Sequence, residues 1–266
     1  MSSKPIRPRP ALAAFCLGAA ALAAALAFKP YPALEGKDLL RSDDKVRVEA
    51  EASGLAFLPA ADPGADMARK RSGLVFYGAA RVPPEAYAYL ARACALAGYT
   101  AILASMPLNF PLLAPSKASL AAAAHPEVTR WVIAGHSLGG AIAAAYVARP
   151  AAAQTARGAA TSVVGLLLLA ASPGRGVDLS TKSLPVVTVS ASRDALESPE
   201  SIAAAQGRLP AGSRYVEIAG GNHAQFGEYG PQPGDGSAEI PGPAQRQAAV
   251  DEALALLGSA EAGAGK

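Results

Sequence analysis

The chain has 266 residues, of which 51% are hydrophobic and 17% charged, enough to bury the core of one sizeable domain. Its net charge is +3, and three basic residues, Lys4, Arg7 and Arg9, lie in the first ten positions without an acid. Without these three, the 24 basic residues fall to 21, which equals the number of acidic residues. The rest of the chain is therefore near neutral, and no nucleic-acid partner is expected.

An uncharged run of mainly Ala, Leu and Phe follows from Ala11 to Phe28. A basic start before an apolar stretch is typical of a secretory signal peptide or an uncleaved anchor, and Ala25-Leu26-Ala27 provides a small-x-small cleavage pattern. We therefore predict that residues 1–28 export the protein, which is secreted, periplasmic or tethered to a membrane. Membrane contact is expected through this segment only. After cleavage Cys94 would be the one remaining cysteine, which excludes an intramolecular disulfide.

The remaining chain is predicted to hold a linker at 29–40, one domain at 41–258 and a flexible tail at 259–266. Alternating or apolar runs predict strands at 45–50, 54–58, 74–77, 100–104, 131–134, 163–170, 184–191 and 214–218. Helical patterns are predicted at 84–97, 116–124, 141–149, 200–206 and 244–257. From 74 onward strands alternate with helices, which predicts an α/β fold: a mostly parallel, doubly wound sheet with helices on both faces.

A short motif between a predicted strand and a predicted helix carries the chemistry. Gly135-His136-Ser137-Leu138-Gly139 matches the G-x-S-x-G nucleophile elbow, and a further glycine follows it. In such an elbow the serine lies on a tight turn between strand and helix, and the glycines permit close backbone approach. The motif with its context predicts that Ser137 is a nucleophile.

A serine hydroxyl needs a nearby base, and the chain has three histidines. His125 precedes the serine in the chain. His136 lies inside the elbow, where its ring is expected to point away. His223 follows the last predicted strand, in a glycine-rich loop, and fits the chain order nucleophile, acid, base. We therefore predict that His223 is the base.

The base needs an orienting acid, and only two aspartates lie between Ser137 and His223. Asp194 follows the penultimate predicted strand, the position at which this chain order places the acid. Asp178 follows the preceding strand and is the alternative, although a turn or helix-cap role is equally ordinary for it. We favour Asp194.

Two backbone amides are expected to hold the oxyanion of the reaction. One is the N–H of Leu138, directly after the nucleophile at a helix N-terminus. The second is expected from the loop after the strand at 74–77, where Ala79 is favoured and Ala80 is the alternative. Neither a cofactor nor a metal ion is required by this chemistry.

Three residues are predicted to line the substrate site: Arg81 in the same loop, Phe110 after the strand at 100–104, and Tyr229 in the Gly- and Pro-rich stretch at 227–243. About thirteen residues separate the strands at 163–170 and 184–191, too few for a helical cap. The sequence therefore predicts a small, partly open acyl pocket with minimal cap.

Four segments together resemble a known family: the elbow at 135–140, the Tyr77-Gly78 loop with Pro84-Glu85-Ala86-Tyr87, the stretch 221–227, and the Gly-rich segment 232–236. They are similar to compact bacterial α/β-hydrolases related to dienelactone hydrolase, over about residues 40–258. The resemblance implies the α/β-hydrolase fold and Ser-Asp-His chemistry on an ester-like bond. It departs at position 137, where dienelactone hydrolase has cysteine, and at Ala79, where relatives tend to have glycine.

The function predicted from the sequence is that of a serine hydrolase, an esterase of small carboxylic esters or thioesters that forms an acyl-enzyme intermediate. Because the nucleophile is serine, a general esterase is favoured over a lactone hydrolase. Two alternatives remain open at this point: acyl transfer to an acceptor other than water, and a catalytically silent binding module at the cell surface. The acyl chain, the leaving group and the oligomeric state are not predicted.

Overall fold

The computed structural model describes residues 29–34, 36–60, 70–150 and 162–263. The predicted signal peptide or anchor at 1–28 lies outside these residues. The chain divides into two compact units, Met1–Pro30 and Tyr31–Lys266, and all helices and strands named below belong to the second. No helix in the described part of the chain is long and apolar enough to cross a membrane.

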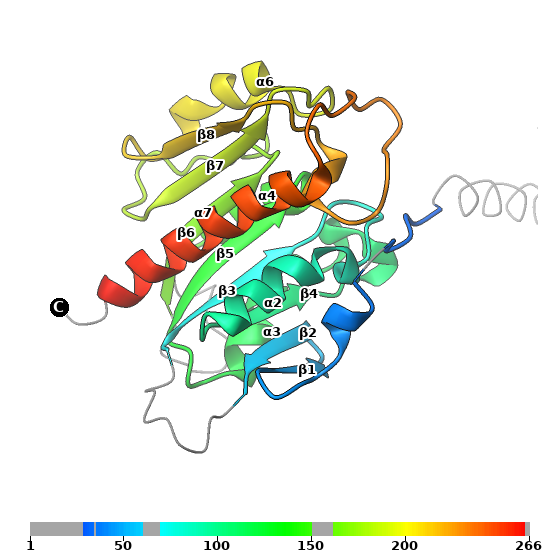
Figure 1. Cartoon of the computed structure of the whole chain (residues 1–266). Coiled ribbons are helices and arrows are strands. Elements are labelled where there is room, and N and C mark those ends of the chain that lie inside the picture. The colour runs from blue at the N-terminus through cyan, green and yellow to red at the C-terminus, as the bar shows by residue number, and fades with distance from the viewer. Residues whose placement is uncertain (1–28, 35, 61–69, 151–161, 264–266) are drawn as a thin grey trace, which may run out of the picture. The chain divides into compact units, whose positions relative to one another are not determined.

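The second unit is built on one eight-stranded sheet, with the strand order β1-β2-β4-β3-β5-β6-β7-β8 (Figure 1). The strands are β1 (Val46–Ala50), β2 (Gly54–Pro59), β3 (Ser72–Tyr77), β4 (Thr100–Ala104), β5 (Arg130–His136), β6 (Ser162–Leu169), β7 (Val186–Ala191) and β8 (Arg214–Ile218). β2 pairs antiparallel with β1 and β4, and every other neighbouring pair is parallel. The predicted mostly parallel sheet is confirmed.

The central strands are mostly apolar because both faces of the sheet are covered. All five residues of β4 are buried, as are the four leucines at 166–169 in β6. Parallel strands covered on both sides have such continuous apolar runs. The edge strand β1 differs: Val46 is fully buried whereas its neighbour Arg47 is exposed, as expected for a strand with one solvent-facing side.

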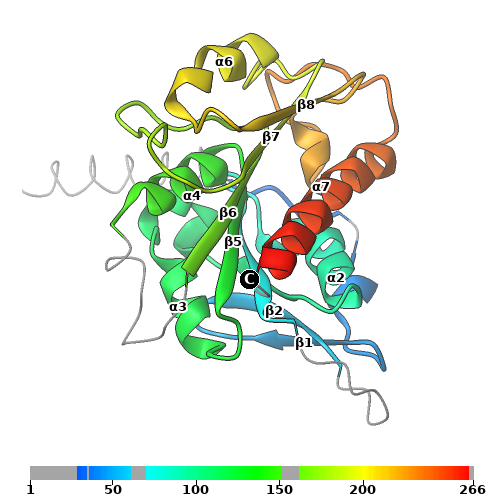
Figure 2. The same cartoon turned by 90° about the vertical axis from the view of Figure 1, so that its left-hand side faces the viewer.

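Helices cover both faces of the sheet, as predicted. They are α2 (Ala88–Leu96), α3 (Lys117–Ala124), α4 (Leu138–Ala148), α6 (Pro199–Ala204) and α7 (Gly242–Ala262). Figure 2 shows α2 and α7 on one side of the sheet and α3 and α4 on the other. Single turns of 3-10 helix occur at η1 (Asp38–Leu40), η2 (Pro84–Tyr87), η3 (Pro107–Asn109), η4 (Pro111–Leu113), η5 (Gln206–Arg208) and η6 (Ala224–Phe226).

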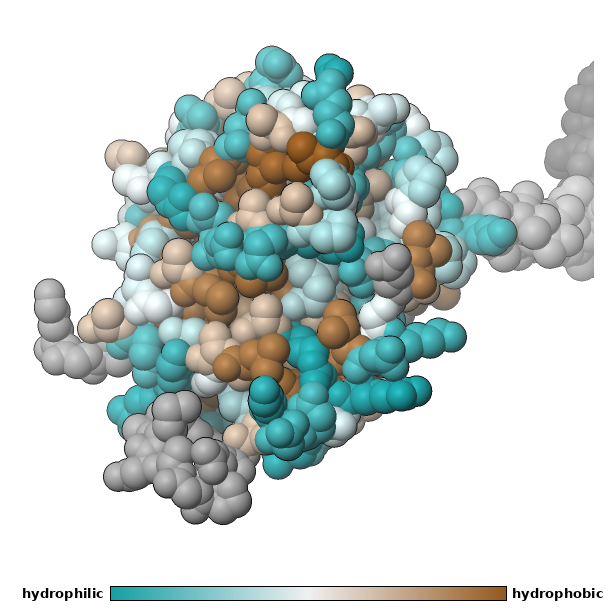
Figure 3. Space-filling view, viewed as in Figure 1, coloured by the Kyte–Doolittle hydropathy of each residue, from teal (hydrophilic) through white to brown (hydrophobic). Residues whose placement is uncertain are grey.

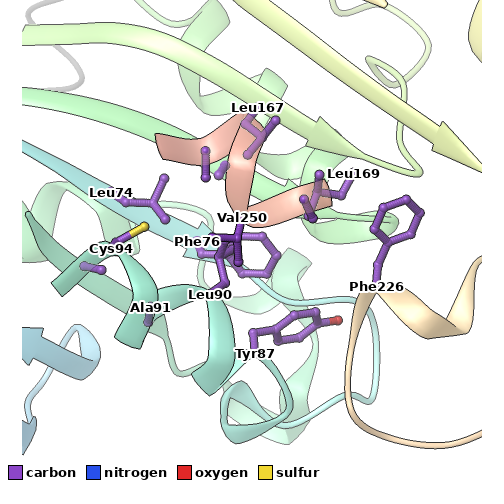
Figure 4. Close-up of a cluster of buried hydrophobic side chains, with 14 of the residues drawn as sticks. Leu74, Phe76, Tyr87, Leu90, Ala91, Cys94, Leu167, Leu169, Phe226 and Val250 are labelled. Carbon is purple, nitrogen blue, oxygen red and sulfur yellow. The ribbon is translucent and has the colours of Figure 1, made fainter. Parts of the chain in front are cut away.

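Each face of the sheet has its own hydrophobic cluster. Figure 4 shows the cluster under α2 and α7, where Phe76 of β3 and Leu169 of β6 meet Leu90 and Val250 from the two helices. Cys94 is buried in the same cluster as a free thiol, and burial raises its pKa to about 12. The outer surface on this side mixes apolar and polar groups (Figure 3).

The predicted linker at 29–40 and part of the predicted flexible tail at 259–266 form hydrogen bonds with the domain. In the predicted linker, the Tyr31 amide donates to the Arg81 carbonyl (2.9 Å), and the Leu34 amide donates to that of Glu228 (2.8 Å). At the other end, α7 runs through Ala262 rather than stopping at 257, because the carboxylate of Glu261 accepts from the amides of Arg71 and Ser72. The remaining tail residues, 264–266, lie outside the described part.

The topology places one end of the sheet where a site is expected. From β3 the chain passes through α2 to β4 on one side, and then through α3 to β5 on the other side of β3. Such a reversal of strand order opens a crevice at the carboxyl ends of the strands. Residues 170–185, which join β6 to β7 at that end, contain no helix. A helical cap is therefore absent from this connection, as predicted.

Candidate active site

Ser137 lies on a strained turn between β5 and α4. Its backbone has φ 54° and ψ −127°, a conformation that L-residues seldom adopt. Two hydrogen bonds hold it: the Ser137 amide donates to the Leu169 carbonyl (3.0 Å), and the Ala141 amide donates to the Ser137 carbonyl (3.2 Å). Strand, strained serine and helix follow one another as the elbow motif predicts.

The elbow glycines are required by close packing. A Cβ atom on Gly139 would lie 2.2 Å from the carbonyl oxygens of Tyr77 and Gly78, and one on Gly135 would lie 2.5 Å from the backbone of Gly139. Real Cβ atoms do not come that close to backbone, so neither position accepts a side chain without movement. The packing of Gly139 brings the loop after β3 against the first turn of α4, next to Ser137.

Asp194 and His223 form a buried pair. Asp194 Oδ2 lies 2.8 Å from His223 Nδ1, and both side chains are almost fully buried. The other oxygen, Asp194 Oδ1, accepts from the amides of Leu196 and Glu197 at 2.8 Å each. The carboxylate is thus held in place by the turn that follows β7, and His223 Nε2 is left buried without a hydrogen-bond partner among the described residues.

Asp178, the alternative acid, lies elsewhere. It is exposed, and its Oδ1 accepts from the amide of Ser180 at 2.8 Å. That backbone hydrogen bond lowers the pKa of the Asp178 carboxyl. This is the geometry of a turn residue, so the structure brings Asp194 and not Asp178 to the histidine.

The loop that carries His223 is fixed from two sides. The carboxylate of Asp235 accepts from the amides of His223 (3.2 Å) and Ala224 (2.8 Å). On the other side, the Gln245 side chain both accepts from the Asn222 amide and donates to the Asn222 carbonyl. The Gly-rich segment at 232–236 therefore positions His223 through Asp235.

The ring of His136 does not point away from the site as expected. Its centroid lies 4.7 Å from that of His223, and Phe226 packs against it at 5.6 Å. His136 Nδ1 lies 2.9 Å from the hydroxyl of Tyr87, which itself accepts from the Ala79 amide at 3.0 Å. The Tyr87 hydroxyl thus connects the loop after β3 with the ring of His136.

Burial keeps His136 neutral. Desolvation of the fully buried ring holds its pKa well below the usual value, and the neighbouring His223 lowers the pKa further. His136 Nε2 is buried without a hydrogen-bond partner among the described residues. Burial also raises the pKa of the Tyr87 hydroxyl, so the pair stays uncharged.

Of the two amides predicted to hold the oxyanion, one is in a suitable position and the other is already hydrogen-bonded. Leu138 is the first residue of α4, so its amide is one of those that a helix leaves without an intrahelical acceptor. The Ala79 amide is instead bonded to Tyr87, and an amide has one hydrogen to donate. Ala79 therefore does not fit the predicted role. Ala80, the alternative, follows in the same loop and is partly exposed.

The three residues predicted to line the substrate lie around the same edge of the sheet. Tyr229 is buried, with its ring 6.4 Å from that of His136 and its hydroxyl bonded to Gln232. The Arg81 guanidinium lies 5.1 Å from the ring centroid of Tyr31. Phe110 is half-buried between η3 and η4. Substrate contact by these residues stays a prediction.

No group of three or more His, Cys, Asp or Glu side chains among the described residues is arranged to hold a metal ion. His125, the remaining histidine, lies between Glu51 (3.1 Å) and Glu127 (3.2 Å). Those contacts belong to a separate hydrogen-bonded cluster.

Comparison with known proteins agrees with this geometry. The model of the alpha/beta hydrolase family matches residues 73–247, and the chain belongs to that family. Comparison with curated protein sequences gave no significant match. The relation to dienelactone hydrolase, expected from the sequence, is not addressed by these matches.

Solved structures with this fold include esterase 2 of Thermogutta terrifontis phosphoramylated by tabun (TM-score 0.54, 14% identity, 82% of this chain and 96% of that one). The butyrate-bound form of the same esterase gives a TM-score of 0.51 at 15% identity, over 81% and 94% of the two chains. A protein from Thermoplasma acidophilum, described as a predicted CIB-like hydrolase, gives 0.53 at 14%, over 77% and 96%. The α/β-hydrolase fold predicted from the sequence is confirmed.

Proposed function

We propose that the protein is a serine esterase that hydrolyses small carboxylic esters or thioesters through Ser137, His223 and Asp194. The observation that carries the proposal is the buried Asp194–His223 pair, whose free Nε2 belongs to a ring packed against the residue before Ser137. An orienting acid, a base and a strained serine are the three parts that this chemistry needs.

In the proposed reaction, His223 Nε2 takes the proton of the Ser137 hydroxyl while Oγ attacks the ester carbonyl carbon. Asp194 Oδ2 accepts the Nδ1 proton of His223, which fixes the tautomer and stabilises the imidazolium. The amides of Leu138 and Ala80 hold the oxyanion. The proton then passes from Nε2 to the leaving alcohol, and water hydrolyses the acyl-enzyme by the same route.

Several observations support a small ester and a serine mechanism. The connection between β6 and β7 carries no helical cap, so no helix of this connection covers the carboxyl ends of the strands. The related fold in Thermogutta terrifontis belongs to an esterase whose structures include a butyrate-bound form. We place this chain in the serine-nucleophile group of compact hydrolases related to dienelactone hydrolase, and we propose export by residues 1–28.

The test is turnover of p-nitrophenyl acetate by Ser137→Ala. Since the nucleophile would be lost, we expect kcat to fall by about 10³-fold or more, with the circular dichroism spectrum unchanged. Ser180→Ala, at an exposed serine in the β6–β7 connection, is the matched control and should keep full activity. Equal turnover by the parent chain and Ser137→Ala would contradict the proposal and favour a silent binding module.

A further inference from the structure

A patch of exposed leucines lies on the segment that follows β4. Leu108, Leu112 and Leu113, on the turns η3 and η4, are 70%, 57% and 54% exposed. Pro107 beside them is exposed as well. We call these four residues the leucine patch. An apolar group of this kind on a surface marks a contact with a protein, a membrane or a ligand.

The exposure of the leucine patch is built into the fold. Leu108 and Asn109 both have positive φ, 55° and 52°, a conformation that asparagine accepts but that is strained for leucine. The Asn109 carbonyl accepts from the Arg81 amide at 2.7 Å, and Pro111 between the leucines is buried. The segment is therefore held in a conformation that presents its leucines to the outside.

The leucine patch adjoins the candidate active site. It follows β4 at the carboxyl edge of the sheet, where Ser137 follows β5. A small crevice between the two is lined by Gly78 and Ala79 on one side and by Met106, Asn109 and Pro111 on the other. A surface that docks through the leucine patch would thus lie next to the loop proposed to hold the oxyanion.

The position of the first residues of the domain indicates which partner the leucine patch contacts. Tyr31, the first residue of this unit, donates to the Arg81 carbonyl, and Arg81 in turn donates to Asn109. The uncharged run at 11–28 ends three residues before Tyr31, a distance of at most about 11 Å in extended chain. A chain anchored by that run would hold the leucine patch at the membrane.

The charge of the segment fits a membrane as well. No Asp or Glu occurs between residues 86 and 126, which include the whole leucine patch. Of the two basic residues in this stretch, Arg92 is ion-paired with Asp43, and Lys117 follows the patch by four residues. An apolar segment without acidic side chains suits contact with anionic lipid headgroups.

We propose that the leucine patch inserts into the bilayer that holds the N-terminal segment, and that the site acts on esters borne by that bilayer. The second part rests on the proposed esterase function. The first part is independent of it.

The catalytic test compares two substrates with the full chain reconstituted in phosphatidylcholine–phosphatidylglycerol vesicles. One ester is soluble, p-nitrophenyl acetate, and one is carried in the vesicle, p-nitrophenyl palmitate. For Leu108→Ser/Leu112→Ser/Leu113→Ser we expect unchanged turnover of the acetate and a loss of about tenfold or more on the palmitate. Leu96→Ser is the control. Leu96 is 55% exposed, but it ends α2 near the amino ends of the strands, away from the leucine patch.

A loss of turnover on both esters, or on neither, would overturn the proposal about the substrate.

Docking is measured separately from catalysis, by tryptophan fluorescence of Leu112→Trp in vesicles of brominated lipid, which quenches an inserted indole. The one native tryptophan, Trp131, is buried and contributes little to this quenching. We expect quenching of the introduced indole beyond that of the parent chain. Absence of quenching, or a lipid-free dimer that the triple serine variant abolishes, would overturn the docking. If neither ester is hydrolysed by the parent chain, the proposed function fails and the quenching result still stands.

Discussion

At the scale of single residues, Asp194 divides its two oxygens between two tasks. Oδ1 accepts the amides of the turn after β7, and Oδ2 faces His223. Asp178 is an exposed turn residue and has no contact with His223. Burial and the contact with His223 therefore distinguish the two aspartates, between which the sequence alone did not decide.

We predict that Asp194→Asn lowers kcat for p-nitrophenyl acetate by about 10²-fold to 10⁴-fold, since an amide group cannot stabilise the imidazolium of His223. Asp178→Asn, assayed side by side, should change kcat by less than about twofold, because this exposed carboxylate only accepts a local backbone amide. A larger loss in Asp178→Asn than in Asp194→Asn would reverse the assignment.

His136 should make the fold sensitive to acid. Its pKa is lowered in the folded state, so the unfolded chain binds the proton first as the pH falls. The stabilisation is therefore present above the usual histidine pKa of about 6.5 and is lost below it, by at most about 1.4 kcal/mol per pH unit. Urea unfolding at pH 7.5 and pH 5.0 measures this. His136→Asn should lose less stability between the two pH values than the parent chain, and equal losses would contradict the prediction.

The direction in which the His136 ring points could not be predicted from the sequence. Tyr87, which bonds it, comes 49 residues earlier. Motif spacing carries no information on such a contact, and a second hydrogen bond of the same Tyr87 hydroxyl occupies the Ala79 amide. By contrast, Ser137 and His223 could be predicted, because an elbow motif and the order of three histidines fix them without knowledge of side-chain packing.

At the scale of elements, the elbow depends on contact between the loop after β3 and the start of α4. We predict that Gly139→Ala disrupts it, because the added Cβ would lie 2.2 Å from two carbonyl oxygens. Unfolding in urea should reveal a loss of about 2 kcal/mol or more, together with loss of activity. Gly212→Ala is the control, since nothing lies within 4 Å of its Cβ. Equal stability of the two variants would contradict the role of this contact.

Element boundaries were predictable where local sequence decides them. β4 and β8 begin and end where their apolar or alternating runs do. The helix expected at 84–97 instead begins as the 3-10 turn η2, with Pro83 and Pro84 at its start, and becomes α-helical at Ala88. The extension of α7 to Ala262 depends on a contact between Glu261 and the start of β3, 189 residues apart, which no local pattern contains.

At the scale of the whole molecule, the alternation of strands and helices predicted a parallel, doubly wound sheet but not its strand order. The order depends on which way each connection crosses, and that choice brings β5 next to β3 and places Ser137 beside the loop after β3. The near-neutral composition and the uncapped β6–β7 connection, by contrast, follow directly from the sequence.

The central claim, that Ser137 is a nucleophile activated by His223, is tested most directly by reaction with a fluorophosphonate followed by peptide mass spectrometry. We predict one adduct per folded chain, located on Ser137, and a large reduction of its rate in His223→Ala. Folded protein that takes up no label, or a label on another residue that persists in Ser137→Ala, would contradict the account.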